Sequence, residues 1–146
     1  MLYAVIMAGG TGTRFWPESR AQRPKQLLPM LGDTTMIRTT VNRLRDLVPR
    51  ERLIVSTTAA LAPSIAQELP ELPRGAVLAE PCKRNTAPCI GLAAHMIVRR
   101  DPEGVMGVMP ADHVIADEHA FRDAVRYAEA LVEEFRGLGL LEDITE

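Results

Sequence analysis

Four short apolar runs, separated by longer segments with helical periodicity, constrain the fold of this chain more than any other feature. The runs contain no charged residue and cover Tyr3–Ala8, Leu53–Thr57, Ala76–Ala79 and Val105–Met109. Continuous apolar runs of this length are typical of strands that are covered on both faces. Because strands that alternate with helices form βα units, the sequence predicts an α/β fold with a mostly parallel sheet.

The segments between these runs carry the predicted helices. The first helix has one apolar stripe at helical spacing, formed by Met36, Ile37, Val41, Leu44 and Val48. A later threonine, Thr86, precedes Ala87 and Pro88, which predicts a helix that threonine caps and that carries proline in its first turn. The predicted helices are Thr35–Val48, Ala60–Leu69, Ala87–Arg100 and Glu118–Arg136.

Composition and cysteine content limit the class of protein. The chain has 146 residues, of which 47% are hydrophobic and 25% are charged, an ordinary composition for one ordered domain. The apolar run at its start is too short to span a membrane and lacks the basic flank and cleavage site of a signal peptide. Cys82 and Cys89 match no metal-ligand or disulfide spacing, so we expect reduced packing residues in a cytoplasmic protein without membrane contact.

Charge is unevenly distributed along the chain. Residues 1–50 carry eight Lys and Arg against three Asp and Glu, whereas residues 101–146 carry three against twelve. The arginines of the basic part lie among turns rather than along one helix face, which favours a small anionic ligand over a nucleic acid. We interpret the acidic part as the solvated face of a helix.

The longest irregular stretch, Gly9–Gly32, follows the first predicted strand and contains GGTGTRFWP. A dinucleotide-binding fingerprint would need glycine at Phe15 and an immediate helix, which the prolines forbid, and the Walker lysine motif is not present. Gly9, Gly10 and Gly12 still offer bare backbone amides to an anion, because glycine permits close approach and positive φ. A purely structural turn is the alternative.

Two cations strengthen the interpretation as a phosphate site. Arg14 lies in the glycine loop and Lys25 follows a proline, and both can reach the carboxyl end of the strand, where open α/β sheets bind ligands. A planar guanidinium and a compact ammonium can divide the contacts along a polyphosphate. Taken singly, each cation is more often a surface charge. Trp16 either stacks on the ligand or anchors the loop.

Three ordered motifs resemble a known family. AGGTGTRFWPESR with PKQ resembles the signature of sugar-phosphate nucleotidyltransferases, and EPCKRNTAP at 80–88 and MPADHVI at 109–115 are similar to the mannose-1-phosphate guanylyltransferases. The resemblance implies a Rossmann-like, truncated nucleotidyltransferase fold and the reaction of GTP with mannose 1-phosphate to give GDP-mannose and pyrophosphate, with Mg²⁺. A noncatalytic GTP-binding or regulatory module, and a transferase for another sugar phosphate or base, stay open as alternatives.

The resemblance also implies roles for single residues. Arg14 and Lys25 would contact the phosphates, and Asp112 would ligate Mg²⁺, since a carboxylate directly after a strand is a ligand that this metal takes. As a lone aspartate, Asp112 is equally compatible with a helix cap, and we interpret His95 and His113 as structural. The expected nucleotide contacts are Gly9, Gly10, Thr11, Gly12, Thr13, Glu80, Pro81, Arg84, Asn85 and Thr86.

Within this set, the segment EPCKRNTAP is expected to recognise base and ribose. Glu80 and Pro81 would supply backbone contacts, and Arg84, Asn85 and Thr86 would supply polar groups at a helix N-terminus. Simple helix capping by Asn85 and Thr86 is the alternative, and both roles can coexist.

The similarity covers residues 2 to about 135, which predicts a nucleotide-binding part at 1–136 and a divergent acidic tail at 137–146. The family's sugar-site motif and its second metal-binding aspartate have no counterpart in these residues. We therefore expect these residues to be insufficient for independent catalysis. We also expect exposed sheet edges and apolar faces, through which such a chain can associate with itself.

Overall fold

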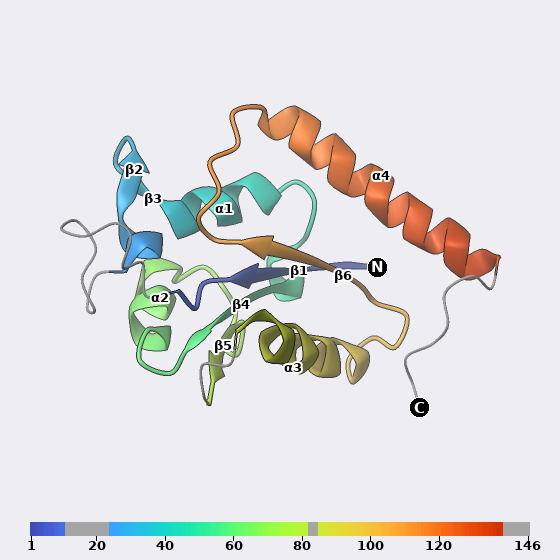
Figure 1. Cartoon of the computed structure of the whole chain (residues 1–146), viewed down its shortest axis with the longest axis horizontal. Coiled ribbons are helices and arrows are strands. Elements are labelled where there is room, and N and C mark those ends of the chain that lie inside the picture. The colour runs from blue at the N-terminus through green and yellow to red at the C-terminus, as the bar shows by residue number, and fades with distance from the viewer. Residues whose placement is uncertain (11–23, 82–84, 139–146) are drawn as a thin grey trace. The chain divides into compact units, whose positions relative to one another are not determined.

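A computed structural model describes residues 1–10, 24–81 and 85–138. The chain divides into two compact units, Met1–Val114 and Ile115–Glu146. The first contains the sheet and the helices that cover it, and the second contains a single long helix (Figure 1). The boundary predicted at residues 136 and 137 stays a prediction.

The first unit is built on a four-stranded parallel sheet with the order β5-β4-β1-β6. Its strands are β1 (Leu2–Met7), β4 (Leu53–Thr58), β5 (Val77–Glu80) and β6 (Val105–Pro110). Ala4 of β1 lies in register with Leu53 of β4, and Leu2 lies in register with Val105 of β6. The sheet confirms the α/β prediction, and all four strands lie within one residue of their predicted bounds.

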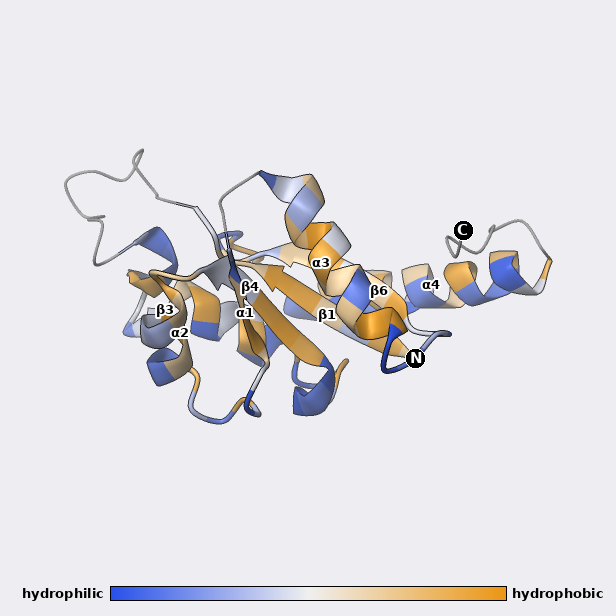
Figure 2. Ribbon diagram, turned by 90° about the horizontal axis from the view of Figure 1, so that it is seen from below, coloured by the Kyte–Doolittle hydropathy of each residue, from blue (hydrophilic) through white to orange (hydrophobic). Residues whose placement is uncertain are grey.

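Helices cover both faces of the sheet, which explains why its central strands β1 and β4 are buried along almost their whole length (Figures 1 and 2). On one face, Ala93 and Ile97 of α3 (Thr86–Val98) pack with Tyr3, Val5 and Ile54 of the sheet. Figure 1 shows α1 (Met36–Leu44) on the opposite face. The predicted apolar stripe of this helix is buried throughout, including Val48, which lies beyond the helix end.

Helix α1 ends earlier than the sequence predicts. The backbone N–H groups of Leu47 and Val48 both donate to the carbonyl of Leu44, at 3.0 Å each, so the chain turns there instead of continuing as a helix. Pro49 follows directly, and a residue that precedes proline is disfavoured in helical conformation. The apolar periodicity therefore continued beyond the end of the helix.

Shorter elements complete the first unit. Helix α2 (Ala62–Glu68) carries proline in its first turn, and a 3-10 helix η3 (Arg50–Arg52) leads into β4. The stretch predicted as irregular over Gly9–Gly32 is partly ordered, because it contains a 3-10 helix η2 (Lys25–Leu27) and strand β2 (Pro29–Leu31). Strand β2 pairs antiparallel with β3 (Thr34–Thr35) around a turn in which Gly32 adopts φ +73°.

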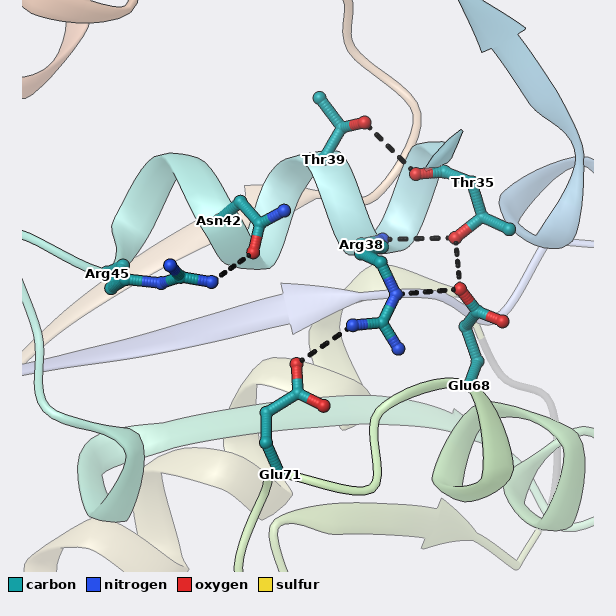
Figure 3. Close-up of polar contacts among 7 residues, drawn as sticks. All are labelled: Thr35, Arg38, Thr39, Asn42, Arg45, Glu68 and Glu71. Atoms are coloured by element: carbon teal, nitrogen blue, oxygen red, sulfur yellow. Dashed lines mark hydrogen bonds and ion pairs between the residues drawn. The ribbon is translucent and has the colours of Figure 1, made fainter. Parts of the chain in front are cut away.

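A polar cluster, the Arg38 clip, joins the start of α1 to the end of α2 (Figure 3). It consists of Thr35, Arg38, Glu68 and Glu71. Arg38 donates from Nε to Glu68 (3.0 Å) and from Nη1 to Glu71 (3.2 Å), while Thr35 donates to Glu68 (2.8 Å). The Thr35 hydroxyl also accepts from the backbone N–H of Arg38 and so caps α1. These contacts hold α1 in place on the first unit.

The second unit is formed by α4 (Glu118–Gly137), which begins at the N-cap Asp117, whose carboxylate accepts from the N–H of Ala120 at 2.9 Å. Polar and apolar residues alternate along this helix (Figure 2). Ion pairs such as Arg122 with Glu118 lie on it at helical spacing, in agreement with a solvated charged face. Across the described residues, no helix combines the length and the apolar character needed to cross a membrane.

Candidate functional site

A pocket of about 260 Å³ lies at the carboxyl ends of the parallel strands. Strand β1 contributes Met7, β5 contributes Glu80 and β6 contributes Pro110, and the N-terminus of α3 closes another side. Ligands of open α/β sheets bind at this edge, because the loops and helix N-termini converge there. Among the described residues, the lining consists of Met7, Gly9, Gly10, Lys25, Gln26, Glu80, Asn85, Thr86, Cys89, Pro110 and Asp112.

The backbone that follows β1 forms one wall of this pocket. The Gln26 side chain, only 2% exposed, donates from Nε2 to the carbonyls of Ala8 and Gly10, at 3.1 Å each. A Cβ added to Gly9 would lie 3.5 Å from Glu80 Oε1, and one added to Gly10 would lie 3.4 Å from Gln26 Nε2. Neither glycine adopts positive φ, so the property of glycine that this wall uses is the absence of a side chain.

Lys25 and Asp112 meet in this pocket as an ion pair. They are 87 residues apart in sequence, with Lys25 in η2 and Asp112 just after β6, and their side chains are 20% and 26% exposed. The helix-cap alternative for Asp112 is wrong, because Asp117 is the residue that caps α4. The carboxylate of Asp112 therefore belongs to the pocket.

Glu80 contributes its side chain as well as its backbone. The residue is 8% exposed, and its Oε1 accepts a hydrogen bond of 3.1 Å from the buried hydroxyl of Ser56 on β4. We expected a backbone contact from Glu80, whereas the structure places the carboxylate at the pocket wall beside Gly9.

Cys89 lies next to this glutamate. Burial raises the pKa of the Cys89 thiol, the hydrogen bond with Ser56 lowers it, and the Glu80 carboxylate raises it further. The thiol is 3% exposed, which agrees with the expected packing role of Cys89. Cys82 lies outside the described residues.

The start of α3 differs from its prediction by one residue. Asn85, rather than Thr86, occupies the N-cap, and its side chain makes no capping hydrogen bond. Asn85 adopts φ 65° and ψ −155°, a region that costs a non-glycine residue about 1–3 kcal/mol. Both residues line the pocket. The capping interpretation is therefore wrong for Thr86, and a strained Asn85 stands at the pocket instead.

The remaining predicted residues fall into two groups. Pro81 is exposed and does not belong to the pocket lining, and His95 and His113 are exposed as well. The other predicted positions lie outside the described residues: Thr11, Gly12, Thr13, Arg14, Trp16 and Arg84.

Four lining residues were not predicted as site residues: the strand-end residues Met7 and Pro110, and the side chains Gln26 and Cys89. Gln26 directly follows Lys25 in the PKQ motif, and Cys89 follows Thr86 by three residues, so both share a helical face or turn with a predicted residue. The short sequence distance of Gln26 and Cys89 from predicted site residues was therefore the one feature of the sequence that could have indicated them.

The donor set of the pocket fits Mg²⁺ held together with a nucleotide. Mg²⁺ is usually bound through one or two carboxylates plus substrate phosphates and waters, and less often in a cage of protein ligands. Asp112 offers such a carboxylate, and no group of three or more His, Cys, Asp or Glu is present among the described residues.

An open parallel sheet whose carboxyl-end pocket combines bare glycine backbone, a lysine and an aspartate defines a class of α/β proteins that bind phosphorylated ligands. Comparison with protein families identifies which family within this class the chain belongs to. The profile of the family described as Nucleotidyl transferase matches residues 3–142, and the chain belongs to this family.

Similar proteins agree with this assignment. The mannose-1-phosphate guanylyltransferase of Escherichia coli K12 is 47% identical over 137 residues, which are 88% of this chain and 28% of the relative. The ManC guanylyltransferase of Salmonella typhimurium LT2 is 44% identical over the same shares. The chain thus spans less than a third of the length of these relatives.

Solved structures confirm the fold. A crystal structure from Thermus thermophilus, described as a mannose-1-phosphate geranyltransferase, superposes with a TM-score of 0.75 at 34% identity, covering 86% of this chain and 36% of that one. A putative glucose-1-phosphate thymidylyltransferase from Bacillus anthracis superposes with a TM-score of 0.71 at 21% identity, covering 89% and 51%, and this likeness concerns the fold alone.

Proposed function

We propose that this chain forms the GTP-binding part of a mannose-1-phosphate guanylyltransferase, which joins GTP and mannose 1-phosphate to GDP-mannose and releases pyrophosphate. The observation that carries the proposal is the pocket in which Lys25 and Asp112 pair beside the Gly9–Gly10 backbone. The guanylyltransferase relatives, at 44–47% identity, support the choice of substrates.

The chemistry explains why cations and amides surround such a pocket. An oxygen of the sugar phosphate attacks the α-phosphorus of GTP, the bond from that phosphorus to the bridging oxygen breaks, and pyrophosphate leaves with the electron pair. At about 4 Å and an effective dielectric constant near 20, each pair of like unit charges costs about 4 kcal/mol. Neutralisation and alignment of two anions, rather than a nucleophilic side chain, therefore supply the catalysis.

Within this proposal, Lys25 exchanges one partner for another. Its ammonium contacts Asp112 in the structure, and a bound triphosphate would offer phosphate oxygens to the same ammonium. Asp112 would then hold Mg²⁺, which would supply positive charge to offset that of the phosphates. Arg14, which lies outside the described residues, would contact the leaving pyrophosphate.

Glu80 supports guanine as the base. An ionised carboxylate only accepts hydrogen bonds, and guanine presents two adjacent donors, N1–H and the N2 amino group. Ser56 donates to Oε1 of Glu80 and so orients this carboxylate at the pocket wall, where it would accept from the base. Gly9 carries no side chain on this part of the pocket wall, where an added Cβ would lie 3.5 Å from Oε1 of Glu80.

A cytoplasmic location and the absence of nucleic-acid or membrane partners belong to the same proposal. The free Cys89 agrees with a reducing compartment. Self-association through an open sheet edge also stays a proposal, supported by the edge position of β6 in the described sheet.

The direct test is a binding titration of the chain with GTP, ATP, UTP and dTTP in the presence of Mg²⁺, accompanied by a pyrophosphate-release assay with mannose 1-phosphate. We expect GTP to bind most tightly and Arg14→Ala to weaken that binding. Equal affinities for the four nucleotides would reject the guanine assignment, and no binding of any of them would reject the nucleotide site.

A further inference from the structure

The loop that carries Asp112 is held by hydrogen bonds from outside the pocket. Two residues of α1, Thr40 and Arg43, are 2% and 3% exposed and lie one helical turn apart. Arg43 donates from Nη2 to the carbonyl of His113 at 3.3 Å, and Thr40 donates to the carbonyl of Ala111 at 3.5 Å. Ala111 and His113 are the two residues that flank Asp112 in the chain.

The two contacts differ in strength. The Thr40 hydroxyl has one hydrogen and directs it mainly to the carbonyl of Met36 at 3.0 Å, so its bond to Ala111 is the weaker of the pair. The Arg43 bond is charge-assisted, and hydrogen bonds from charged donors are stronger than those between neutral groups. Arg43 is therefore the principal contact to the loop.

Helix α1, which carries Thr40 and Arg43, is itself held in place by several contacts. It is buried along its apolar stripe, capped by Thr35 and fixed to α2 by the Arg38 clip (Figure 3). On the other side of the loop, the N–H of Ala111 donates to the carbonyl of Met7 at 3.0 Å. The Asp112 backbone thus lies between β1 and α1, which leaves its side chain aimed at Lys25.

We propose that Arg43, assisted by Thr40, is a positioning residue that fixes Asp112 for metal-dependent nucleotide binding. Neither residue lines the pocket, so both act through the backbone of the Asp112 loop. Partners that orient a metal ligand from behind typically change metal affinity about 10- to 100-fold when removed. The inference rests on the proposed function, since it takes Asp112 as the Mg²⁺ ligand.

The test measures the factor by which Mg²⁺ raises the affinity of the chain for GTP. Arg43→Met removes the donor and keeps an unbranched apolar side chain, and we expect it to lower this factor about 10-fold. Thr40→Val should lower it about threefold, as expected for one weak neutral hydrogen bond. Arg43→Lys restores a cationic donor and should recover part of the loss.

Thr39→Val is the matched control. Thr39 lies on the same helix and donates to the carbonyl of Thr35 at 3.1 Å, which is the same backward bond that Thr40 makes to Met36. The Thr39→Val variant therefore carries the same substitution at a residue with no hydrogen bond to the Asp112 loop. Its Mg²⁺ factor should stay at the wild-type value.

A double-mutant cycle with Asp112→Asn separates positioning from general destabilisation. If Arg43 acts through Asp112, Arg43→Met has no further effect on the Mg²⁺ factor once Asp112 is asparagine. The inference alone is overturned if the wild-type chain responds to Mg²⁺ and the folded Arg43→Met and Thr40→Val variants show the same Mg²⁺ factor as wild type. It is also overturned if Arg43→Met weakens GTP binding to the same extent with and without Mg²⁺. A wild-type chain that binds no GTP overturns the proposed function together with it.

Discussion

The Lys25–Asp112 pair and the Arg38 clip contain the same kinds of side chain in similar surroundings, yet they differ in what they can do. The side chains of Lys25 and Asp112 are 20% and 26% exposed, and those of Arg38, Glu68 and Glu71 are 32%, 27% and 22% exposed. In the clip, each carboxylate is bound by the arginine, and Glu68 also by Thr35, so these charges satisfy one another. In the pocket, the ion pair borders about 260 Å³ of open space.

The difference teaches that half-buried ion pairs do not by themselves identify a functional site. What distinguishes Lys25 and Asp112 is the adjacent void, with the bare backbone of Gly9 and Gly10 on its wall. A ligand there can replace one ion-pair partner without leaving a charge unpaired. At the clip, only Glu71 borders a pocket, of about 150 Å³, and no glycine belongs to its described lining, so the expected contribution of the clip is to stability.

The largest effect that separates the two clusters is expected for Lys25→Met. Loss of the ammonium removes one charge-assisted contact to phosphate, which corresponds to a weakening of GTP binding by about 10- to 100-fold. Titration calorimetry with GTP and Mg²⁺ measures this change. Arg38→Met is the control, since it removes a cation of similar burial outside the pocket. Similar losses of affinity in both variants would contradict the distinction.

A smaller effect is expected for Glu80→Gln. The substitution replaces an acceptor-only carboxylate by an amide that presents two N–H donors, so the match to the donor edge of guanine is lost. We expect the preference for GTP over ATP to fall about 10-fold, the equivalent of one charged hydrogen bond. Competition binding of the two nucleotides gives the ratio. Glu68→Gln serves as the control, and an unchanged ratio in Glu80→Gln would remove the base-recognition role.

The smallest effect is expected for Arg38→Met, and it concerns stability. Arg38 joins α1 to α2 through two partly exposed ion pairs, which solvent screens, so we expect a loss of about 1 kcal/mol in the free energy of unfolding. Urea denaturation measures this loss, while GTP affinity should not change. Arg45→Met removes one exposed hydrogen bond to Asn42 within α1 and should cost less. A reversed order of the two variants would show that the clip does not stabilise α1.

The sequence predicted the strands more closely than the helix ends. Strands such as β1 and β4 are buried on both faces, and their uncharged, largely apolar runs mark both bounds. The end of α1 depends on competing backbone hydrogen bonds at Leu44, which the apolar stripe does not reveal because Val48 is buried outside the helix. The helix start at Asn85 depends on a positive φ, which no pattern of residues predicted.

Only some residues of the site could be predicted, because the sequence shows which residues follow a strand but not which side chains face the pocket. Lys25, Glu80 and Asp112 each stand in a motif beside a strand end, so their residue types and positions indicated chemistry. Gln26 and Cys89 line the same pocket without resembling site residues in sequence. Their contribution follows from which side chains face the void.

By itself, the sequence determined the parallel α/β fold, the family and the strand ends at which ligand-binding residues stand. Apolar periodicity and motif spacing are local properties, so a reader of the chain can extract them. Only the tertiary structure decided that Asp112 pairs with Lys25 rather than capping a helix, and that Arg43 holds its loop from α1. These contacts join residues 87 and 70 positions apart, and their existence depends on how the helices pack on the sheet.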